Sequence, residues 1–256
     1  MDFKIEKYKN LVRPIYVRCW RLWIRLWERP KGNYPVAIQG IQRSGTNFLT
    51  ALLDQGSYRI LNRLDPKRHD PRHKHCRWQA DKSTIVMDDQ YRNTLSASSV
   101  REINTLCGYA PETKHIILFR APEPWLNSIF RWGLEAEWYP SEDAFFEQQL
   151  HVAYWREWDA FYAFWQDRQR QEPDQVLIVS HKKMIENPQD GLKRIDAFMG
   201  VVRAPHETAF TPIEKVRHSR PIGEKREPLD RAELTDVLDM PTQFDWQSYM
   251  QGNEQA

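Results

Sequence analysis

Residues 40–46, Gly-Ile-Gln-Arg-Ser-Gly-Thr, have the composition of a loop that binds an anion. The apolar run at 36–38 predicts a buried strand before this loop, and the apolar spacing over 48–53 predicts a helix after it. The backbone N–H groups at the start of such a helix carry partial positive charge and have no partner within the helix, so they attract phosphate-like groups. Arg43 adds a cation beside them.

This loop only partly matches a Walker A sequence. Gly40 and Gly45 have the glycine spacing of that motif, but Thr46 replaces its lysine and Asn47 replaces its magnesium-binding hydroxyl residue. Because both the cation and the metal ligand are missing, magnesium-dependent transfer of a γ-phosphate is disfavoured. The loop therefore predicts phosphate binding without a metal, and a tight turn that binds nothing is the alternative.

A second predicted strand ends in a cation. Residues 116–119, Ile-Ile-Leu-Phe, predict a buried strand, and Arg120 follows at the end where open α/β sheets bind ligands. Pro122 and Pro124 favour a turn into a helix, which carries Ser128 eight residues beyond Arg120. A guanidinium and a hydroxyl suit a second phosphate group.

Together these stretches resemble the sulfotransferases that use 3′-phosphoadenosine-5′-phosphosulfate (PAPS). That family's 5′-phosphosulfate loop reads approximately [KR]-[ST]-G-[TS]-[TSN]-[WFL]-L, and residues 43–49 read Arg-Ser-Gly-Thr-Asn-Phe-Leu. Its 3′-phosphate motif is a strand that ends in Arg-[DAN]-Pro, with a serine eight residues after the arginine, as in Arg120, Pro122 and Ser128. A third block, residues 187–200, matches the family's helix after a later strand, whereas His181 replaces the usual tyrosine before it.

The resemblance implies a three-layer, P-loop-like α/β sandwich with a mainly parallel central sheet flanked by helices. It implies an enzyme that transfers a sulfuryl group from PAPS to a hydroxyl or amine acceptor and releases 3′,5′-ADP (PAP). The implied donor-binding residues are Arg43, Ser44, Gly45, Thr46, Asn47, Phe48, Arg120 and Ser128, followed by Arg217, Arg220 and Gly223 of a late basic loop. Arg43 would also stabilise the charge that develops as the bond breaks, so no metal is required.

A basic stretch over 62–78 contains the candidate bases. The resemblance favours His75, because Lys74-His75 resembles a Lys-His pair of the family and because the free pKa of histidine lies near working pH. His69, His73 and an acidic residue stay open as alternatives. A metal site in this stretch is disfavoured, since the spacing of its histidines and cysteine fits no structural zinc pattern.

Two further regions complete the predicted organisation. Residues 1–34 predict an amphipathic helix with arginines on one face and tryptophans around the rest, and an α/β domain is predicted over 35–250. The helix either contacts an anionic membrane through residues 13–28 or packs on the domain. Within the domain, Ser141 is predicted to cap one long helix that is aromatic on a broad face.

Composition excludes several classes of protein. With 37 Lys and Arg against 35 Asp and Glu, the net charge of +2 gives no sign of a nucleic-acid partner. Three scattered cysteines imply no disulfide framework and suit a reducing cytoplasm. No signal-peptide pattern or long uncharged run is present, so the expectation is a cytoplasmic protein, with peripheral membrane contact as an option. The sequence carries no signal of an oligomeric state.

The acceptor is the least constrained part of this interpretation. Arginine at the first loop position is more typical of the carbohydrate and bacterial branches of the family, so a carbohydrate is expected first and a glycolipid second. Two other functions stay open. One is an NTP-dependent kinase with a degenerate Walker A loop, and the other is a non-catalytic, membrane-peripheral protein that binds a nucleotide.

Overall fold

The structure is a computed structural model that describes residues 34–56, 58–63, 70–79, 94–202, 213 and 232–251. The predicted N-terminal helix, His69 and the late basic loop with Arg217, Arg220 and Gly223 lie outside the described residues.

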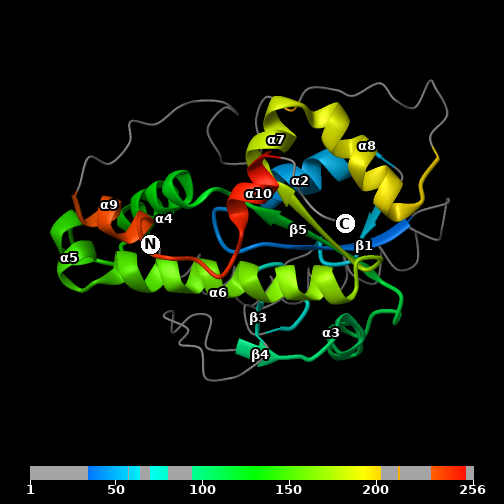
Figure 1. Cartoon of the computed structure of the whole chain (residues 1–256), viewed down its shortest axis with the longest axis horizontal. Coiled ribbons are helices and arrows are strands. Elements are labelled where there is room, and N and C mark those ends of the chain that lie inside the picture. The colour runs from blue at the N-terminus through cyan, green and yellow to red at the C-terminus, as the bar shows by residue number, and fades with distance from the viewer. Residues whose placement is uncertain are drawn as a thin grey trace, which may run out of the picture.

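Four parallel strands form the central sheet, in the order β2-β1-β5-β6 (Figure 1). They are β1 (Tyr34–Gln39), β2 (Tyr58–Ile60), β5 (Lys114–Phe119) and β6 (Val176–Ser180). A separate pair of parallel strands comprises β3 (Arg77–Gln79) and β4 (Thr94–Ser96). The mainly parallel central sheet that the resemblance implied is confirmed.

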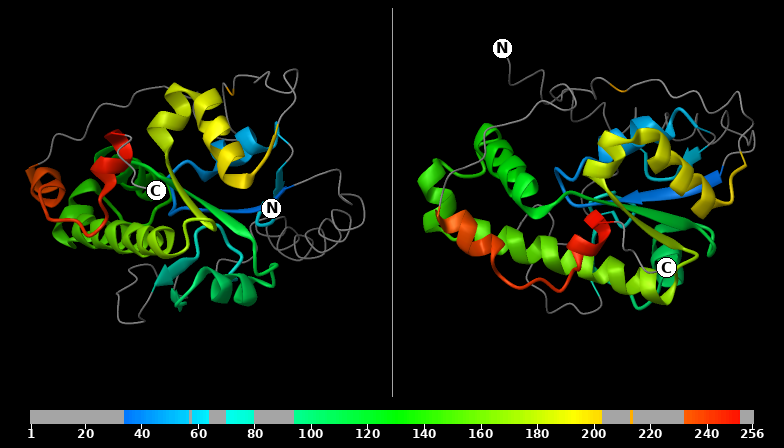
Figure 2. Two further views of the ribbon diagram at one scale, coloured as in Figure 1. Left: turned by 45° about the vertical axis from the view of Figure 1, so that its right-hand side comes forward. Right: turned by 45° about the horizontal axis from the view of Figure 1, so that its top comes forward.

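Helices cover both faces of the sheet and give the three layers. In Figures 1 and 2, α2, α7 and α8 lie on one face, and α6 and α3 lie on the other. The helices of the described residues are α2 (Thr46–Leu53), α3 (Val100–Cys107), α4 (Pro122–Glu135), α5 (Glu142–Glu147), α6 (Leu150–Gln171), α7 (His181–Glu186), α8 (Pro188–Met199), α9 (Ala232–Leu238) and α10 (Trp246–Gln251). At the end of the sheet where the strands finish, α4, α5 and α9 gather around the start of α6 (Figure 1).

Alternating side chains of the strands feed two separate cores. In β5, Ile116 and Leu118 join the core beneath α2 and α8, whereas Ile117 and Phe119 join the core against α6. Both cores are fully closed to solvent at these positions. The strands are therefore buried on both faces. Because they are held in this way, the loops that follow them start from fixed positions at the end of the sheet.

The single aromatic helix predicted after Ser141 is wrong, because the chain forms two helices there. Ser141 does cap the first, since its hydroxyl accepts a hydrogen bond from the Ala144 N–H, but α5 ends after six residues. Gln149 then takes a left-handed conformation with φ 54°. This turn lets aromatic rings of α5 pack on α6, as in the Phe146–His151 pair, whose ring centroids lie 5.2 Å apart.

Histidine burial makes the stability of the fold depend on pH. His115 in β5 is 0% exposed, and its Nε2 hydrogen-bonds the Asn104 side-chain oxygen over 2.8 Å. Burial lowers the pKa of His115 from 6.5 to about 3. The folded protein therefore keeps this ring neutral at pH values where the unfolded chain protonates it, and stability falls as pH drops below 6.5.

We expect His115 to make the free energy of unfolding fall by about 1.4 kcal/mol for each pH unit below its unfolded pKa. Urea unfolding at a series of pH values tests this, with His115→Gln as the comparison, because glutamine offers Asn104 a donor and does not titrate. The variant should show a shallower pH dependence than the wild type. Parallel curves would contradict the assignment.

Candidate functional site

The strand order reverses between β1 and β5, and we call the region beyond the carboxyl ends of these two strands, where open α/β sheets bind ligands, the crevice. From β1 the chain crosses to β2 on one side, and from β5 it crosses to β6 on the other. Such a reversal leaves an opening beyond the carboxyl ends of the two central strands. Gly40 follows β1 and Arg120 follows β5, and the strands pair through Gln39 and Ile117. The two anion-binding segments predicted from the sequence are therefore neighbours.

The loop after β1 is tightly wound against the sheet. A Cβ atom on Gly40 would lie 2.8 Å from the Leu118 carbonyl oxygen and 2.5 Å from Ser44 Oγ, so only glycine fits. Arg43 and Gly45 take left-handed conformations with φ 65° and 98°. Within the described part of the chain, α2 begins after Gly45 without a side-chain cap, so no capping side chain satisfies its first backbone N–H groups.

Side chains of the loop divide into buried and exposed groups. Ser44, Thr46 and Phe48 are 0%, 3% and 5% exposed, so they anchor the loop, whereas Arg43 and Asn47 are exposed. Their backbone groups and the two exposed side chains are thus the parts of the loop that face a ligand.

Arg43 joins the two predicted motifs directly. Its Nε donates a hydrogen bond to Ser128 Oγ on α4 over 3.1 Å. The same guanidinium lies over the Trp132 ring, with 5.5 Å between Cζ and the ring centroid. Residues 85 positions apart in the chain therefore meet at the crevice.

A lysine outside the loop lies beside the start of α2, close to the position where a Walker A loop carries its lysine. Lys74 Nζ donates to Asn47 Oδ1 over 2.8 Å, and the Lys74 carbonyl accepts from the Gly40 N–H over 3.0 Å. The residue is only 9% exposed. The sequence identified Lys74 only as the neighbour of His75 and did not predict its place beside the first turn of α2.

His75 is held against the loop in one tautomer. Its Nδ1 hydrogen-bonds the Gly40 carbonyl oxygen. A carbonyl only accepts, so Nδ1 carries the hydrogen and Nε2 keeps a lone pair. Burial and the neighbouring Lys74 cation lower the pKa of His75 well below 6.5, so the ring is neutral at physiological pH.

His73 is the other described histidine among the candidate bases. It is 5% exposed, and its Nδ1 accepts a hydrogen bond from the His75 backbone N–H over 3.1 Å. The two rings lie 5.3 Å apart. His73 therefore supports the backbone of His75, whereas the His75 ring contacts the donor loop.

His181 lies directly on the loop, although the sequence placed it only at a departure from the family pattern. A Cβ atom on Gly45 would lie 2.1 Å from His181 Cδ2, so the imidazole rests on the glycine. Phe48 packs against the same ring at 6.1 Å. Burial and the nearby Arg120 cation lower the pKa of His181 to about 3. The ring is therefore a neutral wall of the crevice.

Tryptophan N–H groups from two helices hold the loop carbonyls. Trp125 Nε1 on α4 donates to the Gln42 carbonyl over 2.7 Å, and Trp158 Nε1 on α6 donates to the Arg120 carbonyl over 3.1 Å. The sequence marked these residues only as parts of apolar helix faces. A buried indole N–H usually has a hydrogen-bond partner, and this was the signal in the sequence that could have predicted these contacts.

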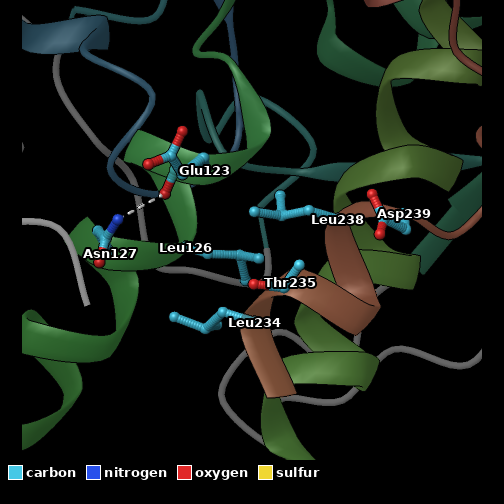
Figure 3. A pocket seen from close by; sticks show the side chains of 7 residues that line it. All are labelled: Glu123, Leu126, Asn127, Leu234, Thr235, Leu238 and Asp239. Atoms are coloured by element: carbon cyan, nitrogen blue, oxygen red, sulfur yellow. Dashed lines mark hydrogen bonds between the residues drawn. The ribbon is translucent and has the colours of Figure 1, made fainter. Parts of the chain in front are cut away.

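A cavity of about 270 Å³ lies between α4 and α9, close to Arg120 in the chain (Figure 3). Leu126, Leu234 and Leu238 point toward one another in it, and the carboxylates of Glu123 and Asp239 lie on its two sides. Its remaining lining residues are Asn127 and Thr235. The cavity is thus apolar inside and acidic at the rim.

The described residues contain neither a metal-binding cluster nor a membrane-spanning helix. No cluster of three or more His, Cys, Asp or Glu side chains in this part of the chain is arranged to hold a metal ion. None of the helices described is both long and apolar enough to cross a bilayer.

Comparison with known proteins identifies the family. The sulfotransferase domain family matches residues 34–250, and the chain belongs to this family. The resemblance to the sulfotransferase family is thereby confirmed. A search of curated protein sequences finds no match.

Three solved structures that this chain matches are sulfotransferases. A mouse sulfotransferase complexed with PAP is 18% identical, with a TM-score of 0.41, over 68% of this chain and 60% of its own. A sulfotransferase from Alicyclobacillus acidocaldarius is 17% identical, with a TM-score of 0.42, over 71% and 84%. The sulfotransferase domain of the Synechococcus PCC 7002 olefin synthase is 18% identical, with a TM-score of 0.41, over 85% and 87%. This chain therefore spans less than two thirds of the mouse enzyme.

Proposed function

We propose that this chain transfers a sulfuryl group from PAPS to a hydroxyl or amine acceptor. The observation that carries the proposal is the contact between Arg43 and Ser128, because it brings the 5′-phosphosulfate loop and the 3′-phosphate motif to the same crevice. Family membership supports the same reaction.

The arrangement suits charge stabilisation at the donor. The loop that precedes α2 carries the Arg43 guanidinium, and the Lys74 ammonium bonds Asn47 in the first turn of the helix, so two cations lie beside the helix start. When the acceptor atom bonds to sulfur, the bond from sulfur to the phosphate oxygen breaks and its electron pair leaves with 3′,5′-ADP. Fixed donors and cations stabilise that developing charge without reorganising. Arg120 and Ser128 are assigned to the 3′-phosphate, which fixes the position of the donor.

His75 is assigned as the base. Its Nε2 lone pair takes the proton that the acceptor hydroxyl loses as the new bond to sulfur forms. The Nδ1–H···O=C bond to Gly40 holds the tautomer that leaves Nε2 available. The pKa of His75 lies well below its usual value, so the ring is unprotonated at physiological pH and its Nε2 can accept a proton.

The finer assignments are part of the same proposal. We propose a carbohydrate acceptor first, on the basis of the arginine at position 43, and a glycolipid second, on the basis of the Trp- and Arg-rich helix predicted near the N-terminus. Arg217, Arg220 and Gly223 are proposed to close over the donor. A cytoplasmic location, an α/β domain over 35–250 and membrane contact through residues 13–28 are proposals from the sequence.

Calorimetric titration with 3′,5′-ADP and with ATP, each with and without magnesium, tests the proposal. Tight, metal-independent binding of 3′,5′-ADP with little binding of ATP is expected. Preference for ATP with magnesium would instead support the kinase interpretation. Binding of neither nucleotide would overturn the assignment of the crevice as a donor site.

The role of Arg120 is tested by comparing two nucleotides. Arg120→Ala should weaken 3′,5′-ADP binding about 10- to 100-fold, the range expected for a lost hydrogen bond to a charged group, and should affect 5′-AMP far less. Arg101→Ala, which removes an exposed arginine on α3, is the matched control and should change neither affinity. Equal losses for the two nucleotides on Arg120→Ala would show that Arg120 does not bind the 3′-phosphate.

A further inference from the structure

One buried guanidinium links three segments of the chain at the crevice. Arg77, the first residue of β3, donates from Nε to Glu157 Oε1 on α6. Its Nη1 donates to the His75 carbonyl over 2.8 Å, and its Nη2 donates to Gln42 Oε1. The side chains of Arg77 and Glu157 are each only 4% exposed.

Two of these three acceptors belong to segments that carry the proposed chemistry. Gln42 immediately precedes Arg43 in the donor loop, and its own carbonyl is held by Trp125. The His75 carbonyl belongs to the proposed base. The Arg77 fork therefore bridges the donor loop and the base, and Glu157 fixes the fork to the long helix α6.

Three other contacts between described residues join the two segments. The Gly40 N–H donates to the Lys74 carbonyl over 3.0 Å, Lys74 Nζ donates to Asn47 Oδ1 over 2.8 Å, and His75 Nδ1 donates to the Gly40 carbonyl. The Arg77 fork adds a link between the His75 backbone and Gln42, which none of these three contacts supplies. It therefore restrains the backbone that carries the His75 ring relative to the Gly40 carbonyl.

Stability alone gives no reason for this ion pair. Within the described residues, Glu157 Oε2 is buried without a hydrogen-bond partner, so the carboxylate is incompletely satisfied. Apolar pairs of similar volume are often as stable as buried ion pairs. A planar fork that reaches three acceptors in fixed directions is what arginine supplies and what leucine, methionine or lysine cannot.

We propose that Arg77, anchored by Glu157, is a positioning residue that fixes His75 against residues 40–42 and thereby keeps the Nδ1–H tautomer with a free Nε2 lone pair. The inference rests on the proposed function only in giving His75 the role of base. The geometry itself concerns residues of this chain and requires no donor or acceptor.

The test is ¹⁵N NMR of the imidazole rings in the full chain, with the His75 signals assigned by their absence in His75→Asn. The wild type should show His75 as the Nδ1–H tautomer alone. The double variant Arg77→Met/Glu157→Leu removes both charges together, so no unpaired buried charge remains. In this variant the Nε2–H tautomer of His75 should become populated as well.

The matched control is Arg168→Met. Arg168 is another buried arginine, 7% exposed, but it lies near the other end of α6 and donates to the Ser98 carbonyl. This variant should lose stability and keep the wild-type His75 tautomer. A tautomer shift in Arg168→Met similar to that in the double variant would show a general loss of packing and would overturn the proposal.

Arg77→Lys keeps the test decisive if the double variant does not fold. It retains a charge beside Glu157 but loses the fork, and it should give the same mixture of tautomers. A single Nδ1–H tautomer in either folded Arg77 variant would overturn the proposal. Titration of the wild type with 3′,5′-ADP is the separate arm that tests the proposed function, because a failure to bind would leave the tautomer result unaffected.

Discussion

His75→Asn is expected to lower the rate of sulfuryl transfer by about 10²- to 10⁴-fold, the usual contribution of a positioned general base. Asparagine can place an amide N–H where Nδ1 lies, so the hydrogen bond to the Gly40 carbonyl can persist. It offers nothing at the position of Nε2. The variant therefore removes the proposed proton acceptor while leaving the anchoring contact in place.

The rate is measured as release of 3′,5′-ADP from PAPS with a panel of sugar acceptors, and 3′,5′-ADP affinity should stay close to that of the wild type. His73→Asn is the matched control, since an asparagine oxygen can still accept the His75 N–H and the rate should change little. Survival of turnover in His75→Asn, with loss in His73→Asn, would move the base to His73.

The pH dependence of the rate gives a second check on His75. Since burial and Lys74 lower the pKa of His75, the acid limb of the pH–rate profile should have its midpoint below 6.5. A midpoint above 6.5 would mean that the base is another group, whose pKa is not lowered by burial.

Gly45→Ala is expected to weaken 3′,5′-ADP binding by about 100-fold, because misplacement of a binding loop by an ångström has effects of this size. Two features of the position contribute. Its φ of 98° is unfavourable for any residue with a side chain, and the new methyl group would lie 2.1 Å from His181 Cδ2. The loop and the imidazole must both move.

Two comparison variants separate these features by calorimetry. Gly108→Ala imposes a φ of 68° at the end of α3, where a Cβ meets nothing within 4 Å, so it should reduce stability without changing 3′,5′-ADP affinity. Gly45→Ala/His181→Ala removes the clash but keeps the strained φ, so affinity should recover only in part. Unchanged affinity in Gly45→Ala would contradict the assignment of this loop to the donor.

Local sequence patterns predicted the parts of the site that lie within one short stretch. Residues 40–46 follow a buried strand and precede an apolar helix, and Arg120 follows another such strand, so both loops were found with their flanking elements. Strand–loop–helix units of this kind need no information from distant residues. The fold class came from the family resemblance that these stretches carry, and the repeated strand–loop–helix units are consistent with it.

Contacts across the fold could not be read in the same way. Lys74 reaches Asn47 from 27 residues away, and Arg77 meets Glu157 from 80 residues away. No local periodicity encodes such a pairing, because it depends on which strand ends adjoin. The break before α6 was missed for a different reason. Gln149 adopts a left-handed conformation that the sequence would indicate only through glycine or asparagine.

The indole hydrogen bonds at the crevice make the proposed donor site observable by light. Trp125 and Trp158 donate to carbonyls of Gln42 and Arg120, one on each of the two segments proposed to bind phosphate. Indole emission responds to the hydrogen bonding and polarity around the ring, so occupancy of the crevice should alter the protein's intrinsic fluorescence. The enzyme thus contains its own reporter group, and nucleotide screening can proceed before any acceptor is identified and without a label.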